Sequence, residues 1–230
     1  MKKTYNFLKI WYEEKTVDID GVIMQDIILL GIGGHAHSVV DSIESNGIYH
    51  ICGFLDIEDK MGEQYRGHQV LGTDDLLSEY IKKGIKNAFV TIGYMGKGSI
   101  RNILYGQLKM LGFHLPVIID KTAIVAKDVS LGEGTFVGKA AVINSAVEIG
   151  NMCIINTAAI IEHDCRVDDL SHISVGSVLC GNVQVGRASF IGANATVIQG
   201  KTIGNQCIIG AGTTVRKNIE DGRIVWSGER

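Results

Sequence analysis

The sequence predicts two structural units, an N-terminal α/β domain followed by a parallel β-helix made of six-residue repeats. Three observations lead to this prediction. An aliphatic residue recurs at every sixth position from Leu131 to Val215. Glycine is abundant, with 29 residues in a chain of 230. Ahead of the repeats, short apolar runs alternate with segments of helical spacing, which is typical of α/β sheets.

The first unit is expected over residues 26–118, after an N-terminal extension of residues 1–25 that is weakly patterned. The run Asp26–Ile32 predicts a buried strand that ends in glycines. The elements expected after it are a helix over 35–46, a strand over 48–55, a helix from Thr73 to about residue 83, a strand over 88–92 and a helix over 99–111. Thr73 and Ser99 are predicted helix caps. This alternation predicts a parallel sheet.

The second unit is expected over residues 119–218, followed by a C-terminal tail of residues 219–230. A period of six fits neither a helix nor a simple strand, so each repeat must combine a short strand with a turn. A small residue usually stands four positions after each aliphatic, and three of these are Cys153, Cys165 and Cys207. If three repeats close one coil, residues eighteen apart stack at a spacing of ~4.8 Å. Glycines directly after the aliphatics, such as Gly186, are expected to permit tight turns.

Composition excludes several classes of function. The formal net charge is −3, which gives no basic surface for nucleic acid. No apolar run reaches ~18 residues, so no membrane span is expected and a cytoplasmic protein is predicted. Five cysteines without a CxxC pair predict buried thiols rather than disulfides. Only two histidines, His163 and His172, lie in the repeats, which argues against a zinc site, and no metal is expected.

A glycine-rich turn follows the first strand and opens the first helix. It contains Gly31, Gly33, Gly34 and His35, and Asp56 closes the next strand about 20 residues later, as in dinucleotide-binding folds. Glycines let a phosphate approach the backbone, and the helix N-terminus favours its charge. A unit of about 90 residues is too short for both halves of a dinucleotide fold, so a single nucleotide is the better interpretation. The alternative is a turn that only helix packing requires.

Two further residues are candidates for the same ligand site. Gly93 follows the third predicted strand and so reaches the same edge of the sheet, where ligands of open α/β sheets collect. Arg101 lies near the start of the last helix and could pair with a phosphate, although a surface arginine is the ordinary alternative.

His163 is the strongest catalytic candidate in the repeats. It lies at an outward position, and its neighbours along the chain include Glu162 and Asp164. A carboxylate beside an imidazole raises its basicity and fixes its tautomer, as a general base requires. The alternative is an ordinary surface histidine.

Two segments resemble one enzyme family. GIGGHAHSVVDSI, near the N-terminus, and IINTAAIIEHDCRVDDLSHISVGSVLCGNVQVG, in the repeats, are similar to NeuD/PglD-type bacterial sugar acetyltransferases. The resemblance covers about residues 26–218. It implies a Rossmann-like nucleotide-binding domain joined to a left-handed β-helix, with acetyl-CoA as co-substrate and a nucleotide sugar as acceptor. It also implies a homotrimer with active sites between subunits.

The resemblance assigns roles to individual residues. His163 would be the general base, Asp164 would orient it, and the amide of Gly181 would face the developing oxyanion. His172 is expected near the thioester of acetyl-CoA. The other residues expected to contact acetyl-CoA are Asn156, Gly192, Ala193, Gly210 and Ala211. His35 would face the nucleotide sugar, and Asp56 would read the nucleotide base.

The sequence leaves the acceptor open. The first hypothesis is N-acetylation of a nucleotide-linked 4-amino-4,6-dideoxy sugar, and the second is O-acetylation of sialic acid or a related surface sugar. A non-catalytic scaffold that binds a nucleotide sugar is a third, and an oxidoreductase is disfavoured by the short first unit. The chain departs from the family at its end, where Val225 to Arg230 replace the usual Gly-x-Pro-Ala turn.

Overall fold

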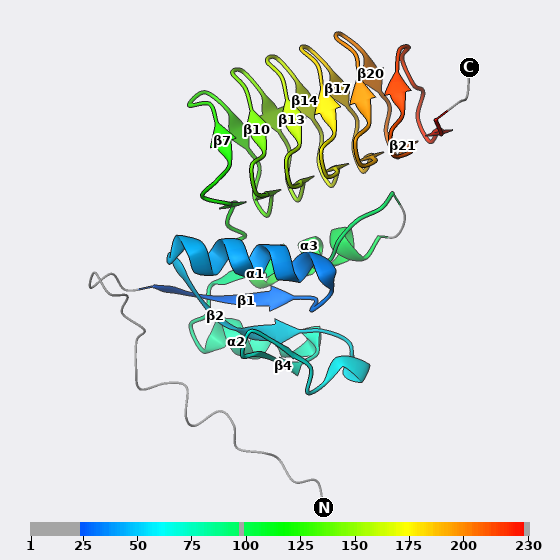
Figure 1. Ribbon diagram of the computed structural model, residues 1–230. Helices are drawn as coiled ribbons and strands as arrows, with labels where there is room; N and C mark the ends of the chain where they lie inside the picture. The colour runs from blue at the N-terminus through cyan, green and yellow to red at the C-terminus, as the bar shows by residue number, and fades with distance from the viewer. Residues whose placement is uncertain (1–23, 97–98, 228–230) are drawn as a thin grey trace, which may run out of the picture.

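The computed structural model describes residues 24–96 and 99–227. Residues 1–23 of the predicted extension and 228–230 of the predicted tail therefore lie outside the described residues. Figure 1 shows the α/β unit lying along one side of a row of stacked coils, which confirms the predicted fold class. Within the described ranges, no helix is both long and apolar enough to cross a membrane.

The α/β unit contains one five-stranded sheet in the order β3-β4-β2-β1-β5. Its strands are β1 (Gln25–Leu30), β2 (Tyr49–Leu55), β3 (Gln64–Tyr65), β4 (His68–Gly72) and β5 (Asn87–Val90). Its helices are α1 (Gly34–Asn46), α2 (Leu77–Lys82) and α3 (Ile100–Leu111), with 3₁₀ turns at Glu58–Lys60 and Asp74–Leu76. Strand β1 runs parallel to both of its neighbours, so the carboxyl ends of β1, β2 and β5 meet at one edge.

Two predictions about this unit are wrong. The sheet is mixed rather than wholly parallel, because β3 and β4 form an antiparallel hairpin that the sequence analysis missed. Thr73 and Ser99 stand at N-cap positions, but neither side chain caps its helix. The hydroxyl of Thr73 instead donates a hydrogen bond to the carboxylate of Asp75, at 3.4 Å.

The β-helix consists of two-residue strands in three parallel sheets, wound left-handed. The docked sheet faces the α/β unit and contains β6 (Ile118–Ile119), β9 (Phe136–Val137), β12 (Ile154–Ile155), β15 (His172–Ile173), β18 (Phe190–Ile191), β21 (Ile208–Ile209) and β23 (Ile224–Val225). The β13 sheet contains β7 (Ile124–Val125), β10 (Val142–Ile143), β13 (Ile160–Ile161), β16 (Val178–Leu179), β19 (Thr196–Val197) and β22 (Thr214–Val215). The β14 sheet contains β8 (Ser130–Leu131), β11 (Glu148–Ile149), β14 (Arg166–Val167), β17 (Gln184–Val185) and β20 (Thr202–Ile203).

The register confirms that three repeats close one coil. Ile161, for example, stacks between Ile143 and Leu179, each eighteen residues away. The repeated aliphatics and the small residues four positions later fill a single core, which includes Cys153 and Cys207. Burial raises the pKa of the Cys153 thiol to about 12, as expected for a core residue. The last strand, β23, pairs with β21, so the coils continue into the segment predicted as a tail.

The glycines after the aliphatics serve a different purpose from the one predicted. Gly186 has no left-handed backbone, but a Cβ added to it would lie 2.7 Å from the backbone nitrogen of Asn205 in the next coil. Real Cβ atoms do not approach so closely, so glycine is needed there for close stacking of coils. The left-handed turn residue comes two positions later, as at Ala188 with φ of 53°.

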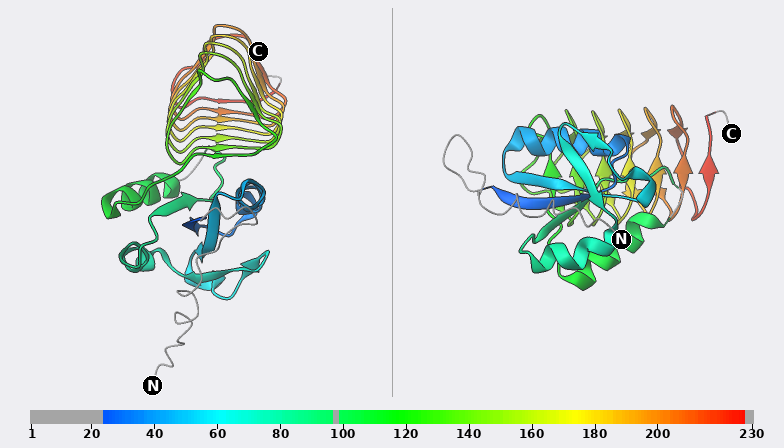
Figure 2. Two further views of the ribbon diagram at one scale, coloured as in Figure 1. Left: turned by 90° about the vertical axis from the view of Figure 1, so that its left-hand side faces the viewer. Right: turned by 90° about the horizontal axis from the view of Figure 1, so that it is seen from below.

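The α/β unit packs against one face of this prism. Phe136 and Ile154 project from the docked sheet into a buried cluster with Val39 and Phe89 of the α/β unit. The view along the coils in Figure 2 shows a triangular cross-section with the α/β unit against one side. The corner between the β13 and β14 sheets, called the apex below, is therefore opposite the docked sheet.

A buried carboxylate ties the two units together. Asp120, directly after β6, accepts hydrogen bonds from Ser42 of α1, at 2.6 Å, and from Thr122, at 2.7 Å. Burial alone would raise the pKa of Asp120, but these donors and Lys139 outweigh it and lower the pKa to about 2. The aspartate is therefore charged at neutral pH and accepts hydrogen bonds from both units.

The stacking role of glycine gives a paired prediction. Gly186→Ala should destabilise the protein by about 1–3 kcal/mol, because the added methyl overpacks the contact between coils. Gly106→Ala, where an added Cβ meets nothing within 4 Å, should instead stabilise α3 by about 0.5–1 kcal/mol. Urea unfolding of both variants measures the difference. Equal effects of the two substitutions would contradict the stacking account.

Candidate active site

Two contacts determine the conformation of the glycine turn after β1: packing against Ile92, which follows β5, and a hydrogen bond to the carboxylate of Asp56. Gly31 has φ of 103°, and a Cβ on it would lie 2.5 Å from Cγ1 of Ile92. Asp56 accepts a hydrogen bond at 2.7 Å from the amide of Ile32 and so holds the turn against β2. These contacts explain two of the predicted residues without any ligand.

Gly33 and Gly34 are different, because packing does not require them. An added Cβ would meet nothing within 4 Å at either position, and both residues are exposed at the N-terminus of α1. Neither has a φ that favours glycine. The turn therefore presents open backbone beside a helix N-terminus, as an approaching phosphate would require.

His35 points away from solvent into the junction of the two units. Its ring packs edge-on against Phe136 with centroids 5.2 Å apart, and its Nε2 atom has no hydrogen-bond partner among the described residues. Burial, together with the smaller effects of Arg101 and His172, lowers the pKa of His35 to about 3. The imidazole is therefore neutral and can exchange a hydrogen bond with a ligand that reaches the junction.

Arg101 is the second buried basic residue of this junction. Its guanidinium donates to the carbonyls of Ile92, after β5, and Met152, in a turn of the β-helix. Burial lowers the pKa of Arg101 to about 10, which still leaves it charged at neutral pH. Its Nε has no acceptor in the described part of the chain. A buried charge without a carboxylate partner is costly, so this arginine is an unusual feature.

His172 connects the loop after β5 to the β-helix. Its Nδ1 donates to the carbonyl of Tyr94, and its Nε2 accepts from the side-chain amide of Asn156 at 3.2 Å. Burial, partly offset by the Tyr94 carbonyl, lowers the pKa of His172 to about 4. The ring is thus neutral with a fixed tautomer. The predicted contact of His172 with the thioester stays a prediction.

The predicted base lies at the apex. His163 follows β13, its side chain is half exposed, and its Nδ1 lies 2.8 Å from the carboxylate of Asp164. This hydrogen bond is the main cause that raises the pKa of His163. A Cβ on Gly181, one coil further on, would lie 2.7 Å from Nε2 of His163. Glycine at 181 therefore leaves room for the imidazole, and the amide of Gly181 has no acceptor among the described residues.

A third group of predicted residues lies at the corner between the docked and β13 sheets. Gly192 and Gly210 are stacked one coil apart there, each followed by an alanine, Ala193 and Ala211. The atypical C-terminus reaches this corner, because the ring of Trp226 packs where a Cβ of Gly210 would be. About half of the Trp226 side chain stays exposed.

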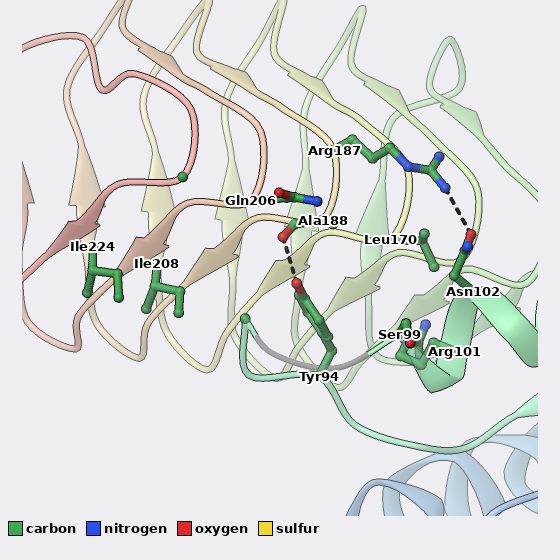
Figure 3. Close-up of a pocket in the computed structure, with 12 residues that line it drawn as sticks. Tyr94, Ser99, Arg101, Asn102, Leu170, Arg187, Ala188, Gln206, Ile208 and Ile224 are labelled. Carbon is green, nitrogen blue, oxygen red and sulfur yellow. Dashed lines mark hydrogen bonds between the residues drawn. The ribbon is translucent and has the colours of Figure 1, made fainter.

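A pocket of about 660 Å³ opens between the loop after β5, the start of α3 and the late coils. Figure 3 shows Tyr94 reaching across it to donate to the carbonyl of Ala188, at 2.7 Å. Arg187 stands at its edge and donates to Asn102 and to Asp169. The sequence analysis found Arg101 of this pocket and the turn at Gly93 beside Tyr94, but it missed Arg187, which had no recognisable motif around it.

One chain does not bring all the predicted residues together. The glycine turn, His35, Gly93 and Arg101 lie near the carboxyl edge of the α/β sheet, and His172 and Asn156 adjoin them through Tyr94. His163, Asp164 and Gly181 follow β13 and β16 and so lie at the apex, across the prism from the docked sheet. A site that includes both groups would need a second copy of the chain.

Comparisons with known proteins agree with this architecture. Residues 26–108 match the family model of the PglD N-terminal domain, and residues 182–217 match that of the bacterial transferase hexapeptide, six repeats. One curated relative, an uncharacterized protein of Acanthamoeba polyphaga mimivirus, is 32% identical over 115 residues. This chain spans only 21% of the length of that protein.

Solved structures extend the likeness over nearly the whole chain. A histidine-to-asparagine variant of perosamine N-acetyltransferase from Caulobacter crescentus, in complex with CoA and GDP-perosamine, is 34% identical with a TM-score of 0.82. The match covers 87% of this chain and 93% of that one. The acetyltransferase domain of PglB from Neisseria gonorrhoeae, in complex with acetyl coenzyme A, is 31% identical with a TM-score of 0.80, covering 88% and 96%. The chain therefore belongs to the NeuD/PglD-type family of acetyl-CoA-dependent sugar acetyltransferases.

Proposed function

We propose that the protein transfers an acetyl group from acetyl-CoA to the amino group of a nucleotide-linked 4-amino-4,6-dideoxy sugar. The observation that carries this proposal is the apex geometry. An exposed imidazole is paired with a carboxylate through Nδ1, and its other nitrogen faces a glycine with a free amide. A perosamine N-acetyltransferase that shares the fold at 34% identity supports an amine as the acceptor.

His163 acts as the general base. The carboxylate of Asp164 accepts a hydrogen bond from Nδ1–H, which leaves Nε2 as the basic nitrogen that faces Gly181. As the sugar amine attacks the thioester carbonyl, Nε2 takes the proton that the nitrogen loses. When the carbon–sulfur bond breaks, the imidazolium returns that proton to the departing thiolate. Acetyl-CoA supplies the activated acetyl group.

Gly181 serves the same step in two ways. Its amide is free to donate a hydrogen bond to the carbonyl oxygen, which becomes negatively charged during the attack. Its missing side chain leaves the space that the His163 ring occupies. Any larger residue at this position would displace the base.

The nucleotide half of the substrate is assigned to the edge of the α/β sheet. The open turn at Gly33 and Gly34 takes a phosphate, and Gly31, His35, Gly93 and Arg101 surround it. Asp56 lies at the end of β2 beside this turn and is assigned to the base of the nucleotide. The N-terminal match to the PglD family and the GDP-perosamine complex of the Caulobacter relative support this assignment.

The active form is proposed to be a homotrimer. His163 lies at the apex, opposite the sheet on which the α/β unit packs, so its own nucleotide site is on the far side of the prism. The outer face of the β13 sheet, between the apex and the Gly192–Gly210 corner, carries a partly exposed aliphatic row: Ile124, Val142, Ile160 and Val178. Burial of this row against a second copy would bring the apex of one chain next to the Gly192–Gly210 corner of another, where acetyl-CoA is expected to bind.

The direct test is an acetyl-transfer assay with a panel of UDP-, GDP- and CMP-linked amino sugars. Release of free CoA is followed with a thiol reagent, and mass spectrometry locates the acetyl group on nitrogen or oxygen. An N-acetylated product supports the proposal. Acetylation of a hydroxyl alone would favour the O-acetyltransferase alternative, and binding of a nucleotide sugar without turnover would favour a scaffold.

Removal of the base should abolish most turnover while leaving donor binding intact. We expect His163→Asn to lower kcat by about 10²–10⁴-fold, since general-base catalysis contributes that much. The affinity for acetyl-CoA, measured by calorimetry, should be little changed. His68→Asn, on β4 away from the apex, is the matched control. Near-normal turnover of folded His163→Asn would rule out the assignment.

The His163–Asp164 pair also predicts a pH dependence. The base must be neutral, so kcat falls as pH drops through the pKa of His163, which Asp164 raises. Asp164→Asn should lower that pKa and extend activity to lower pH, while reducing the maximal rate at high pH because the base is weaker. A pH–rate profile of both proteins measures this. An unmoved acidic limb would contradict the role of Asp164.

A further inference from the structure

A cluster of side chains that can bind a metal lies at the edge of the α/β sheet opposite the glycine turn. Asp26 stands near the start of β1, and His50 and Cys52 stand in the first half of β2. A carboxylate oxygen, a ring nitrogen and the thiol sulfur of these residues all lie within 4.8 Å of one another. Because the glycine turn follows the other end of β1, the cluster is remote from the proposed nucleotide site.

The geometry of the two strands explains why these side chains meet. Successive side chains of a strand point to opposite faces, so His50 and Cys52 share one face of β2. Ile51 between them packs in the core cluster beneath α1, whereas Cys52 packs in the cluster beneath α2 and α3. Asp26 is the register partner of His50 on the parallel strand β1. Sequence spacing could not show the cluster, because strand pairing brings it together.

The cluster is buried at its sulfur and open to solvent at its carboxylate. Cys52 is only 7% exposed, whereas the side chains of His50 and Asp26 are 26% and 54% exposed. A cation from solvent therefore meets the carboxylate first and has a short path to the thiol. Burial, with a smaller effect of Asp26, raises the pKa of the Cys52 thiol to about 12. The thiol thus keeps its proton until a cation replaces it.

A second imidazole–carboxylate pair in the same unit lacks these properties. His68 lies 3.0 Å from the carboxylate of Glu44, but no third side chain of the described residues completes a metal-binding group there. Arg66 also balances the charge of Glu44, at 2.8 Å. In the described part of the chain, by contrast, no lysine or arginine pairs with Asp26, whose carboxylate lies 2.9 Å from His50. The pair at Asp26 is therefore the one suited to a cation.

We propose that Asp26, His50 and Cys52 bind a zinc ion, which joins the starts of β1 and β2. Thiolate, imidazole and carboxylate are the groups that bind Zn²⁺, whereas Mg²⁺ and Ca²⁺ prefer oxygen alone. Tetrahedral zinc holds its ligand atoms roughly 3.3–3.6 Å apart, so shifts of about 1 Å bring the three atoms to bonding distance. The thiol loses its proton to solvent as the Zn–S bond forms, and water takes the fourth position.

The ion would stabilise the fold and take no part in acetyl transfer, so this inference does not depend on the proposed function. A ligand that binds only the folded chain raises its stability in proportion to the logarithm of the free ligand concentration. At free zinc of about 100 times Kd, Tm should rise by about 5–10 °C. An unchanged Tm at saturating zinc would contradict the proposed joining of the two strands.

The first test titrates the full chain, stripped of metal with a chelator, with Zn²⁺, Co²⁺ and Mg²⁺. We expect one equivalent of Zn²⁺ to bind and Mg²⁺ to leave the protein unchanged. The Co²⁺ complex should show the near-ultraviolet absorption of a thiolate bound to cobalt. Stripped protein that binds no zinc, or a Co²⁺ complex without the thiolate absorption, overturns the proposal.

Variants then assign the site. Cys52→Ser and His50→Asn should each weaken zinc by about 100-fold or more, since even loss of indirect support for a ligand costs 10–100-fold. Cys180→Ser removes a partly exposed thiol outside the cluster, and His68→Asn removes the imidazole of the pair without a thiol. Both controls should bind zinc like the wild type. Equal zinc affinities of a cluster variant and its control would show that the ion binds elsewhere.

A third variant separates loss of the site from loss of the fold. Asp26→Asn changes an exposed carboxylate to an amide of the same size, so the metal-free protein should keep its circular dichroism and Tm. We expect it to lose about tenfold or more in zinc affinity and most of the zinc-dependent rise in Tm. A folded Asp26→Asn protein with the affinity and Tm shift of the wild type would exclude the carboxylate and so overturn the three-ligand site.

Discussion

Stacking between coils is the constraint on which the rest of the structure depends. Each strand of the β-helix has two residues, too few to be stable without its neighbours eighteen residues away. The close approach of coils excludes side chains at Gly186 and sets Gly181 beside His163. The same stacking aligns Phe136 and Ile154 into the face on which the α/β unit packs. The positions of the proposed base, the proposed oxyanion donor and the docking face are therefore all set by the same six-residue repeat.

The junction between the two units is held by buried polar groups that bridge them. Arg101 spans Ile92 and Met152, and His172 joins Tyr94 to Asn156. Because His35 and His172 are neutral there, the charge of Arg101 is not opposed by like charges. The loop after β5 is thus fixed to the β-helix, and the proposed nucleotide site at the sheet edge is held in place relative to the coils.

The sequence predicts the β-helix well because each core position repeats, so one pattern specifies every coil. The hairpin of β3 and β4 was missed because Gln64–Tyr65 is too short and polar for a period to show. The resemblance implied active sites between subunits, but the sequence analysis did not say which face of the β-helix is covered, although a signal existed. Outward positions of the docked sheet are apolar, as at Phe136 and Ile154, whereas those of the β14 sheet are polar, as at Glu148 and Arg166. That contrast indicates which face is covered, and hence that His163 lies opposite it.

The central claim is that catalysis joins the apex of one chain to the nucleotide site of another. The most direct measurement mixes two impaired chains in one oligomer. Gly33→Asp places a carboxylate at the open glycine turn, where an added Cβ meets nothing within 4 Å, and His163→Asn removes the proposed base. The account predicts that mixed oligomers regain acetyl transfer, because some interfaces pair an intact turn with an intact base. Mixed oligomers that form but turn over no faster than either parent would contradict it.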